Sequence, residues 1–185
     1  MILAAFLLAM QAAPAAAPAA AKAPPSPVEK LKVIDSVAAL DLFKAVCWDA
    51  FRNPDAFHAA ITLAPVPLAL QPKAEGSTRP GESYRSNEAL LTYLASDGLP
   101  ANIPSRQCHL RVRLAGAADQ LALAARIQQA LALPSGRTRT RAEQSQTEWD
   151  VPGDDARITR LFAITRAAPG GTTELRLSAL LLAQK

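Results

Sequence analysis

The sequence contains few of the residue types that form catalytic or metal-binding sites. It has two cysteines and two histidines, and the cysteines, Cys47 and Cys108, lack the C-x-x-C spacing of a redox pair. Zinc ligation by all four side chains is excluded by geometry, because the adjacent residues Cys108 and His109 would point to opposite faces of a strand. The sequence also lacks a G-x-S-x-G motif and a glycine-rich phosphate loop. We therefore expect no metal and no cofactor, and the sequence favours a non-catalytic protein.

No apolar run is long enough to span a bilayer. The run from Ile2 to Met10 covers about half of the roughly 20 residues that a transmembrane helix requires. An Ala/Pro-rich tract with small-residue cleavage sites follows, which is typical of a secretory signal peptide, although no Lys or Arg precedes the run. A lipid anchor would need a cysteine at the cleavage point, and the first cysteine is Cys47. We predict a signal peptide over residues 1–21 and a soluble mature protein that is periplasmic or secreted.

The predicted mature chain begins with a segment that is poor in large apolar side chains. Residues 22–35 continue the Ala/Pro-rich composition, and such a segment buries too little apolar surface to offset the entropy of ordering. We predict a disordered linker there. Residues 36–185 are enough for one domain with a hydrophobic core, and too few for two.

Three helices are predicted from periodic apolar residues and from capping signals. The first begins at Ser36 as N-cap and continues to residue 52. Asn53 caps a second helix, with Pro at its first position, over residues 55–63. A third apolar stripe spans residues 117–132 and ends before a Pro-Ser-Gly turn.

Strands are predicted where apolar and polar residues alternate. The clearest are residues 107–116 and the C-terminal hairpin 157–183, whose turn contains Pro-Gly-Gly. Residues 84–95 fit a strand or a helix, and we choose a strand. Residues 138–151 suit one long edge strand protected by charge, in which Trp149 either closes the hydrophobic layer or is an exposed binding aromatic.

This element order predicts an α+β fold. We expect a mostly antiparallel sheet of about five or six strands, with two or three helices packed on one face. The segments YLASDGLPANIPSRQCHLRVRL and FAITRAAPGGTTELRLSALL both read as strand, loop and Leu/Arg-alternating strand. They indicate either an internal duplication or a chance recurrence.

A disulfide between Cys47 and Cys108 is predicted. An exported protein folds in an oxidising compartment, and both cysteines face inward on their predicted elements. The bond would close a loop of about 60 residues. In the loop-entropy model this removes conformational entropy from the unfolded chain equivalent to about 4 kcal/mol.

The charge of the chain is the one feature that points to a partner. The formal net charge is +4 and the pI is about 9.4. Arginine is suited to bidentate contact with phosphates and carboxylates. Six arginines share the outward parity of predicted strands: Arg111, Arg113, Arg137, Arg139, Arg141 and Arg176. We expect anionic envelope components as partners, either lipid head groups or acidic polysaccharide, and no nucleic acid. The alternative is that these arginines only solubilise the sheet and guard its edge.

The sequence leaves three functions open. The first is a small exported, envelope-associated binding or structural module. The second is an enzyme whose site is assembled from dispersed residues such as Glu88, Asp97 and His109. The third is a ligand-carrying domain with an apolar pocket between helix 117–132 and the sheet.

Overall fold

The computed structural model describes residues 27–73, 80–96, 100, 103–153 and 157–183. The predicted signal peptide, residues 1–21, lies outside these residues. The helical elements are η1 (Pro27–Lys30), α1 (Ser36–Phe43), η2 (Lys44–Trp48), α2 (Pro54–Thr62) and α3 (Gln120–Ala130). The strands are β1 (Val33–Ile34), β2 (Ala69–Leu70), β3 (Glu82–Arg85), β4 (Ala89–Ala95), β5 (Arg106–Leu114), β6 (Arg137–Arg141), β7 (Gln144–Pro152), β8 (Arg157–Ala168) and β9 (Thr172–Ala183).

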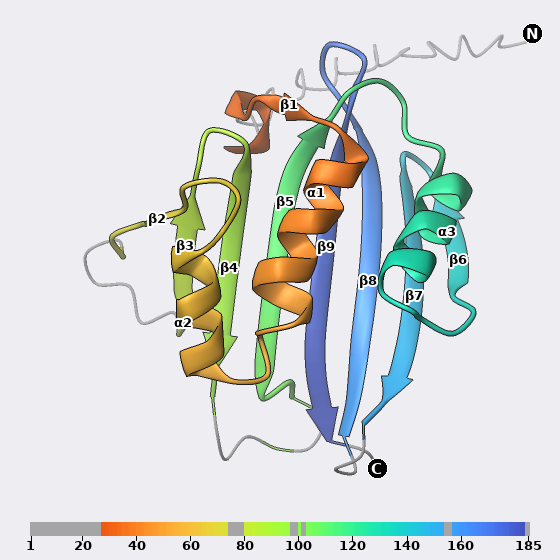
Figure 1. Cartoon of the computed structure of the whole chain (residues 1–185). Helices are drawn as coiled ribbons and strands as arrows, with labels where there is room; N and C mark the ends of the chain where they lie inside the picture. Colours follow the sequence, from red (N-terminus) through yellow and green to blue (C-terminus); the bar gives the residue numbers. More distant parts are fainter. Residues whose placement is uncertain (1–26, 74–79, 97–99, 101–102, 154–156, 184–185) are drawn as a thin grey trace, which may run out of the picture.

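The fold is α+β, as predicted, with a single large sheet. Its strand order is β2-β3-β4-β5-β9-β8-β7-β6, all neighbours being antiparallel, and β1 adds a short parallel pairing to β5. The helices α1, α2 and α3 cover one face of the sheet (Figure 1). Within the described residues the sheet has nine strands rather than the predicted five or six. The difference comes from the short strands β1, β2 and β3 and from a hairpin that we predicted as one strand.

Two halves of similar topology meet at the centre of the sheet. Each half consists of helical structure followed by a four-stranded antiparallel meander, β2 to β5 or β6 to β9. The last strands of the two meanders, β5 and β9, pair with each other. The segments that suggested a duplication form the hairpins β4–β5 and β8–β9, which therefore hold equivalent places on the two sides of the centre.

The folded region begins earlier than predicted. Residues 27–35, which we assigned to the disordered linker, contain η1 and β1, and Val28 and Leu31 are buried. The amide of Lys32 donates to the carbonyl of Asn87, and β1 pairs with the end of β5. Two buried aliphatic side chains and strand pairing offset the conformational entropy that is lost when this segment becomes ordered. The Ala/Pro-rich composition did not indicate these contacts.

The first helix differs from its prediction at both ends. Asp35, rather than Ser36, is the N-cap, and its carboxylate accepts hydrogen bonds from the amides of Val37 and Ala38. The helix then passes into the π-helical turn η2, which carries Cys47. The second helix has Asn53 as its N-cap and Pro at its first position, as predicted.

The stretch predicted as one edge strand is the hairpin β6–β7. Ala142, in the turn, has a φ of 47°, the left-handed region that non-glycine residues rarely adopt. The sequence there has no Gly, Pro or Asn to indicate a turn. Trp149, on β7, has an exposed fraction of 1% and therefore closes the hydrophobic layer. The adjacent chain fits closely around it, because a Cβ on Gly136 would lie 2.4 Å from the Trp149 Nε1.

The core lies between the helices and the sheet, and a disulfide joins the two layers. Cys47 of η2 and Cys108 of β5 are bonded, as predicted, and both are fully buried. The largest side chains of the core are aromatic and aliphatic and come from both layers. These include Phe43, Phe51, Phe57, Leu91, Leu110, Ile127, Trp149, Leu161, Leu175 and Leu177.

Candidate functional site

The second face of the sheet is not covered by the described helices (Figure 1). It presents the side chains that alternate with the core residues of β3 to β9. We call it the open face. The strand register shows which of its side chains are neighbours, and it places each arginine that the sequence singled out.

Two rows of arginines cross the open face at right angles to the strands. In the first arginine row, consecutive Cα partners run from Arg139 through Gln146, Ile164, Arg176, Arg111 and Leu90 to Arg85. In the second arginine row they run from Arg141 through Gln144, Arg166 and Glu174 to Arg113. Since strands lie about 4.8 Å apart, the first row is about 29 Å long. The rows are two residues apart along each strand, which is about 7 Å.

At the centre of the first row, two arginines are direct cross-strand partners. Arg111 of β5 lies opposite Arg176 of β9, an arrangement that is destabilising for like charges. Glu174 offsets one of them by accepting from the Arg111 Nε at 2.9 Å and Nη2 at 2.6 Å. Arg176 is exposed, and in the described chain it makes no ion pair within 4 Å; its Nε donates to the Ser178 hydroxyl. Partial desolvation of its guanidinium group by neighbouring side chains, and then the charge of Arg111, lower the pKa of Arg176.

His109 lies beside this pair and is uncharged at neutral pH. Arginine can only donate, so the contact of 3.4 Å from the Arg176 Nη2 makes the His109 Nδ1 an acceptor. The His109 Nε2 then carries the proton and donates to the Gln107 Oε1 at 3.2 Å. Burial, and then the charge of Arg176, lower the pKa of His109 to about 4.

The other predicted arginines have unequal freedom to bind a partner. Arg113 holds the β8–β9 turn, since its Nε donates to the Thr172 hydroxyl and its Nη2 to the Pro169 carbonyl. Arg137 is paired with Glu148 at 3.0 Å. Arg139 and Arg141 are exposed and have no ion pair among the described residues. They line a shallow depression together with Gln144 and Gln146.

Three arginines of the open face were missed at the sequence level: Arg85, Arg166 and, at the opposite end of the face, Arg160. Arg85 lies on β3 and Arg166 on β8, each at an outward register position. Neither makes an ion pair with a described residue. The alternation of β3 is only four residues long, too short to reveal its outward face. Arg166 has the outward parity of a strand that we predicted, so its position could have been found from the pattern.

The other end of the open face is more apolar. Leu94, Ile158, Leu180 and Leu182 are partly buried there, with Phe162 nearer the centre. Among the described residues, Arg160 and Asp150 form an ion pair at this end: Arg160 donates from Nε and Nη2 to the two carboxylate oxygens of Asp150, at 2.6 and 3.0 Å, and this raises the pKa of Arg160. The unpaired positive charge is therefore concentrated in the two arginine rows.

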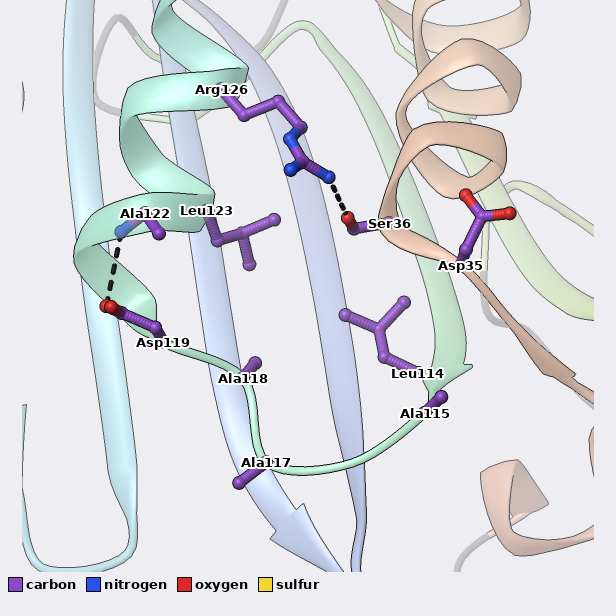
Figure 2. Close-up of a pocket in the computed structure, with 10 residues that line it drawn as sticks. All are labelled: Asp35, Ser36, Leu114, Ala115, Ala117, Ala118, Asp119, Ala122, Leu123 and Arg126. Carbon is purple, nitrogen blue, oxygen red and sulfur yellow. Dashed lines mark hydrogen bonds between the residues drawn. The ribbon is translucent and has the colours of Figure 1, made fainter.

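A cleft of about 290 Å³ lies on the helix side, between α1 and α3 (Figure 2). Leu114 and Leu123 project into it, and Ala117 and Ala118 line the connecting segment. Figure 2 shows the side chain of Arg126 reaching from α3 to the hydroxyl of Ser36, to which it donates a hydrogen bond across the cleft. This cleft corresponds most closely to the pocket of the ligand-carrying alternative. Ile127 of α3 and Trp149 of β7 are part of the hydrophobic core.

The dispersed catalytic site suggested by the sequence is not assembled by the described residues. Glu88 precedes β4, whereas His109 pairs with Thr92, four residues further along. That separation corresponds to about 13 Å of strand. Asp97, the third member, lies outside the described residues. Both cysteines are in the disulfide, and the described part of the chain holds no group of three or more metal-ligating side chains.

A polar cluster that the sequence did not reveal joins α2 to β3. The His58 Nε2 lies 2.9 Å from the Glu82 Oε2, and the Tyr84 hydroxyl donates to the same oxygen. The hydrogen bond from Tyr84, more than that from His58, lowers the pKa of Glu82. Burial and the bond to Glu82 raise the pKa of Tyr84. His58 and Glu82 are 24 residues apart on different elements, so no local pattern marks them.

Comparison with protein-family models, curated proteins and solved structures finds no match for this chain. Among the described residues, no helix is both long and apolar enough to cross a membrane.

Proposed function

We propose that the protein is an exported, non-catalytic binding module that docks through its open face onto the anionic lipid surface of the cell envelope. The observation that carries this proposal is the pair of arginine rows. Five arginines in those rows have no ion pair among the described residues: Arg85, Arg139, Arg141, Arg166 and Arg176. A periplasmic location is consistent with the buried disulfide, since disulfides persist in oxidising compartments.

The layout of charge favours a lipid surface. The rows spread cationic groups over about 29 Å of a continuous sheet. Each basic residue near an anionic membrane contributes about 1 kcal/mol to binding. The apolar side chains at the other end of the open face, such as Leu94, Ile158 and Leu182, suit the boundary between head groups and acyl chains. An acidic polysaccharide provides negative charge for the arginines, but it has no apolar layer to contact these leucine and isoleucine side chains.

Vesicle sedimentation tests this function. Wild-type protein is expected to bind vesicles of phosphatidylglycerol and phosphatidylcholine, and not vesicles of phosphatidylcholine alone. The variant Arg139→Gln/Arg141→Gln should bind about thirtyfold more weakly, because two contributions of about 1 kcal/mol are lost. Raising the salt from about 0.1 M to about 1 M shortens the Debye length from about 10 Å to about 3 Å and should release the protein.

The matched control removes two charges from the helix side. Lys44 and Arg126 lie on η2 and α3, so Lys44→Gln/Arg126→Gln has the same net charge as the test variant and should bind like wild type. Equal weakening in both variants, or equal binding to neutral and anionic vesicles, would contradict docking by the open face. Binding to an acidic polysaccharide without binding to vesicles would reassign the face to that polymer.

A further inference from the structure

The open face contains one depression in which arginines from three strands converge. It has a volume of about 410 Å³. Arg85 comes from β3, Arg111 from β5 and Arg176 from β9, all in the first arginine row. The rest of the lining is mostly neutral: Gln71, Ser83, Tyr84, Leu90, Leu91, Thr92 and His109.

The charges in the depression are not balanced by the protein. Glu174 accepts two hydrogen bonds from Arg111 through its Oε1, and its single negative charge offsets one of the three arginine charges. Arg85 and Arg176 have no carboxylate partner among the described residues, and His109 is uncharged. The depression therefore carries two uncompensated positive charges, from Arg85 and Arg176. An anion with two negative charges would match them.

The neutral side chains fit an anion that is attached to a carbon group. Ser83 and Thr92 are exposed cross-strand partners whose hydroxyls can donate to an oxygen anion. Leu90 pairs with Arg85 on one side and with Arg111 on the other, so it provides an apolar surface between these two arginines in the lining of the depression.

From this geometry we propose that the depression binds a single phosphate monoester group, held between Arg85 and Arg176, with Leu90 against its organic part. A phosphate monoester carries nearly two negative charges at neutral pH, because its second pKa is about 6. The planar guanidinium group of arginine matches the spacing of the phosphate oxygens and can donate two parallel hydrogen bonds to them. A carboxylate would satisfy only one of the two free charges. The inference rests on the proposed function, and it deepens that function by naming the group that the open face recognises.

Isothermal titration calorimetry with inorganic phosphate and with glycerol 3-phosphate tests the site by measuring the affinity for each. Both are expected to bind wild-type protein, glycerol 3-phosphate more tightly because Leu90 contacts its carbon chain. Arg85→Gln and Arg176→Gln should each weaken binding at least tenfold. The control Arg139→Gln/Arg141→Gln removes two charges of the same face outside the depression and should bind phosphate like wild type. Unchanged melting temperatures would show that the variants fold.

The His109 imidazole provides an independent readout by NMR. Its Nδ1 contacts the Arg176 Nη2 of β9, and Arg111 on its own strand and Arg85 of β3 line the same depression. Bound phosphate would offset the charge of Arg176 that lowers the pKa of His109. The pKa of His109 should therefore rise when phosphate binds, and should not respond to phosphate in Arg176→Gln.

Vesicles distinguish a lipid from a soluble source of the phosphate monoester. Phosphatidic acid carries a monoester and phosphatidylglycerol a diester, so a preference for phosphatidic acid that is lost in Arg176→Gln assigns the site to a lipid head group. Phosphate binding without that preference assigns it to a soluble phosphate monoester. Absence of both phosphate binding and the preference overturns the site, and leaves docking of the open face to be judged by the phosphatidylglycerol vesicles alone. Phosphate binding without any vesicle binding supports the site and rejects the docking.

Discussion

The two halves of the molecule share an order of elements but attach their helices to the sheet in different ways. In the first half, the bond between Cys47 and Cys108 joins η2 to β5. In the second half, Gln120 at the start of α3 takes this role through hydrogen bonds. Its Nε2 donates to the Thr147 hydroxyl at 2.8 Å, and its Oε1 accepts from the Thr165 hydroxyl at 2.6 Å. The helical structure of the first half is thus attached to the sheet covalently, and α3 of the second half is attached by the hydrogen bonds of a buried amide.

The two attachments stabilise the fold by different physical routes. A disulfide acts chiefly by restricting the unfolded chain, in proportion to the logarithm of the loop that it closes. A buried hydrogen-bond network acts in the folded state, and losing one member leaves the others unsatisfied in a low dielectric. If each half depends on its own attachment, damage to one should loosen the helix of that half and spare the other. Three predictions test this, beginning with the largest effect.

Removing the disulfide should have the largest effect. We expect Cys47→Ala/Cys108→Ala to lower the free energy of unfolding by about 2–5 kcal/mol in urea titrations. The bond closes a loop with a sequence separation of 61, and the unfolded chain regains that freedom. Hydrogen exchange should accelerate in α1, η2 and α2 and stay slow in α3.

Reduced wild-type protein is the control for this prediction, because it loses the bond without losing the sulfur atoms. It should unfold at a urea concentration close to that of the double variant. Two free thiols titrated in denatured, unreduced wild-type protein would contradict the disulfide itself. Equal acceleration of exchange in α3 would contradict the independence of the halves.

Removing the amide of Gln120 should have a smaller effect. Gln120→Leu leaves the Thr165 hydroxyl without its acceptor, whereas Thr147 keeps its contact with Thr138 at 2.9 Å. We expect the free energy of unfolding to fall by about 1–3 kcal/mol. Exchange should now accelerate in α3 and remain slow in η2, the reverse of the pattern for the disulfide variant.

The triple variant Gln120→Leu/Thr147→Val/Thr165→Val separates the hydrogen bonds from packing. It removes the Gln120 amide together with both threonine hydroxyls, so among the described residues the Ala163 carbonyl, to which the Gln120 Nε2 donates at 3.2 Å, is the one buried group of the network that loses a partner. The triple variant should therefore recover most of the lost stability. A triple variant that is less stable than Gln120→Leu would show that shape, rather than hydrogen bonding, makes Gln120 important.

The attachment of the first half was predictable from the sequence, and that of the second was not. With only two cysteines there is a single possible pairing, and the inward parity of Cys108 followed from the alternation of its strand. Gln120 is a polar residue at the first position of its helix, where no periodic pattern distinguishes a buried amide from an exposed one. Its partners lie 27 and 45 residues away, on strands whose register the sequence does not give.

The candidate site was predictable in the same partial way. Alternation placed Arg111, Arg113 and Arg176 on outward parities, but it did not show that β5 and β9 are neighbours. Which arginines are neutralised depends on cross-strand carboxylates such as Glu148 and Glu174. The turn at Ala142, which folds β6 back onto β7, has no residue that favours a positive φ, so the position of Arg139 and Arg141 relative to the other arginines was not predictable.

The smallest predicted effect concerns a second difference between the halves. The first half also fixes α2 to β3 through the titratable cluster of His58, Glu82 and Tyr84, whereas the network of Gln120 contains no titratable group. Acid should therefore loosen α2 while leaving the attachment of α3 intact. The pKa of Glu82 is lowered from its usual value of 4.5, first by the hydrogen bond from Tyr84 and further by His58. A carboxyl group with a lowered folded-state pKa stabilises the protein above its unfolded-state pKa, and this contribution is lost as the pH falls through the folded-state pKa.

The comparison of wild type with Glu82→Gln measures this contribution. The Glu82 side chain is 38% exposed, so we expect the variant to be less stable by no more than about 1 kcal/mol at pH 7. The difference in free energy of unfolding should shrink as the pH is lowered below about 4.5. Tyr84→Phe is the matched control: it removes the strongest donor, so the pKa of Glu82 should move back toward 4.5 and the acid dependence should weaken. A difference that is independent of pH would mean that Glu82 contributes through packing, and acid would then no longer distinguish the two helical attachments.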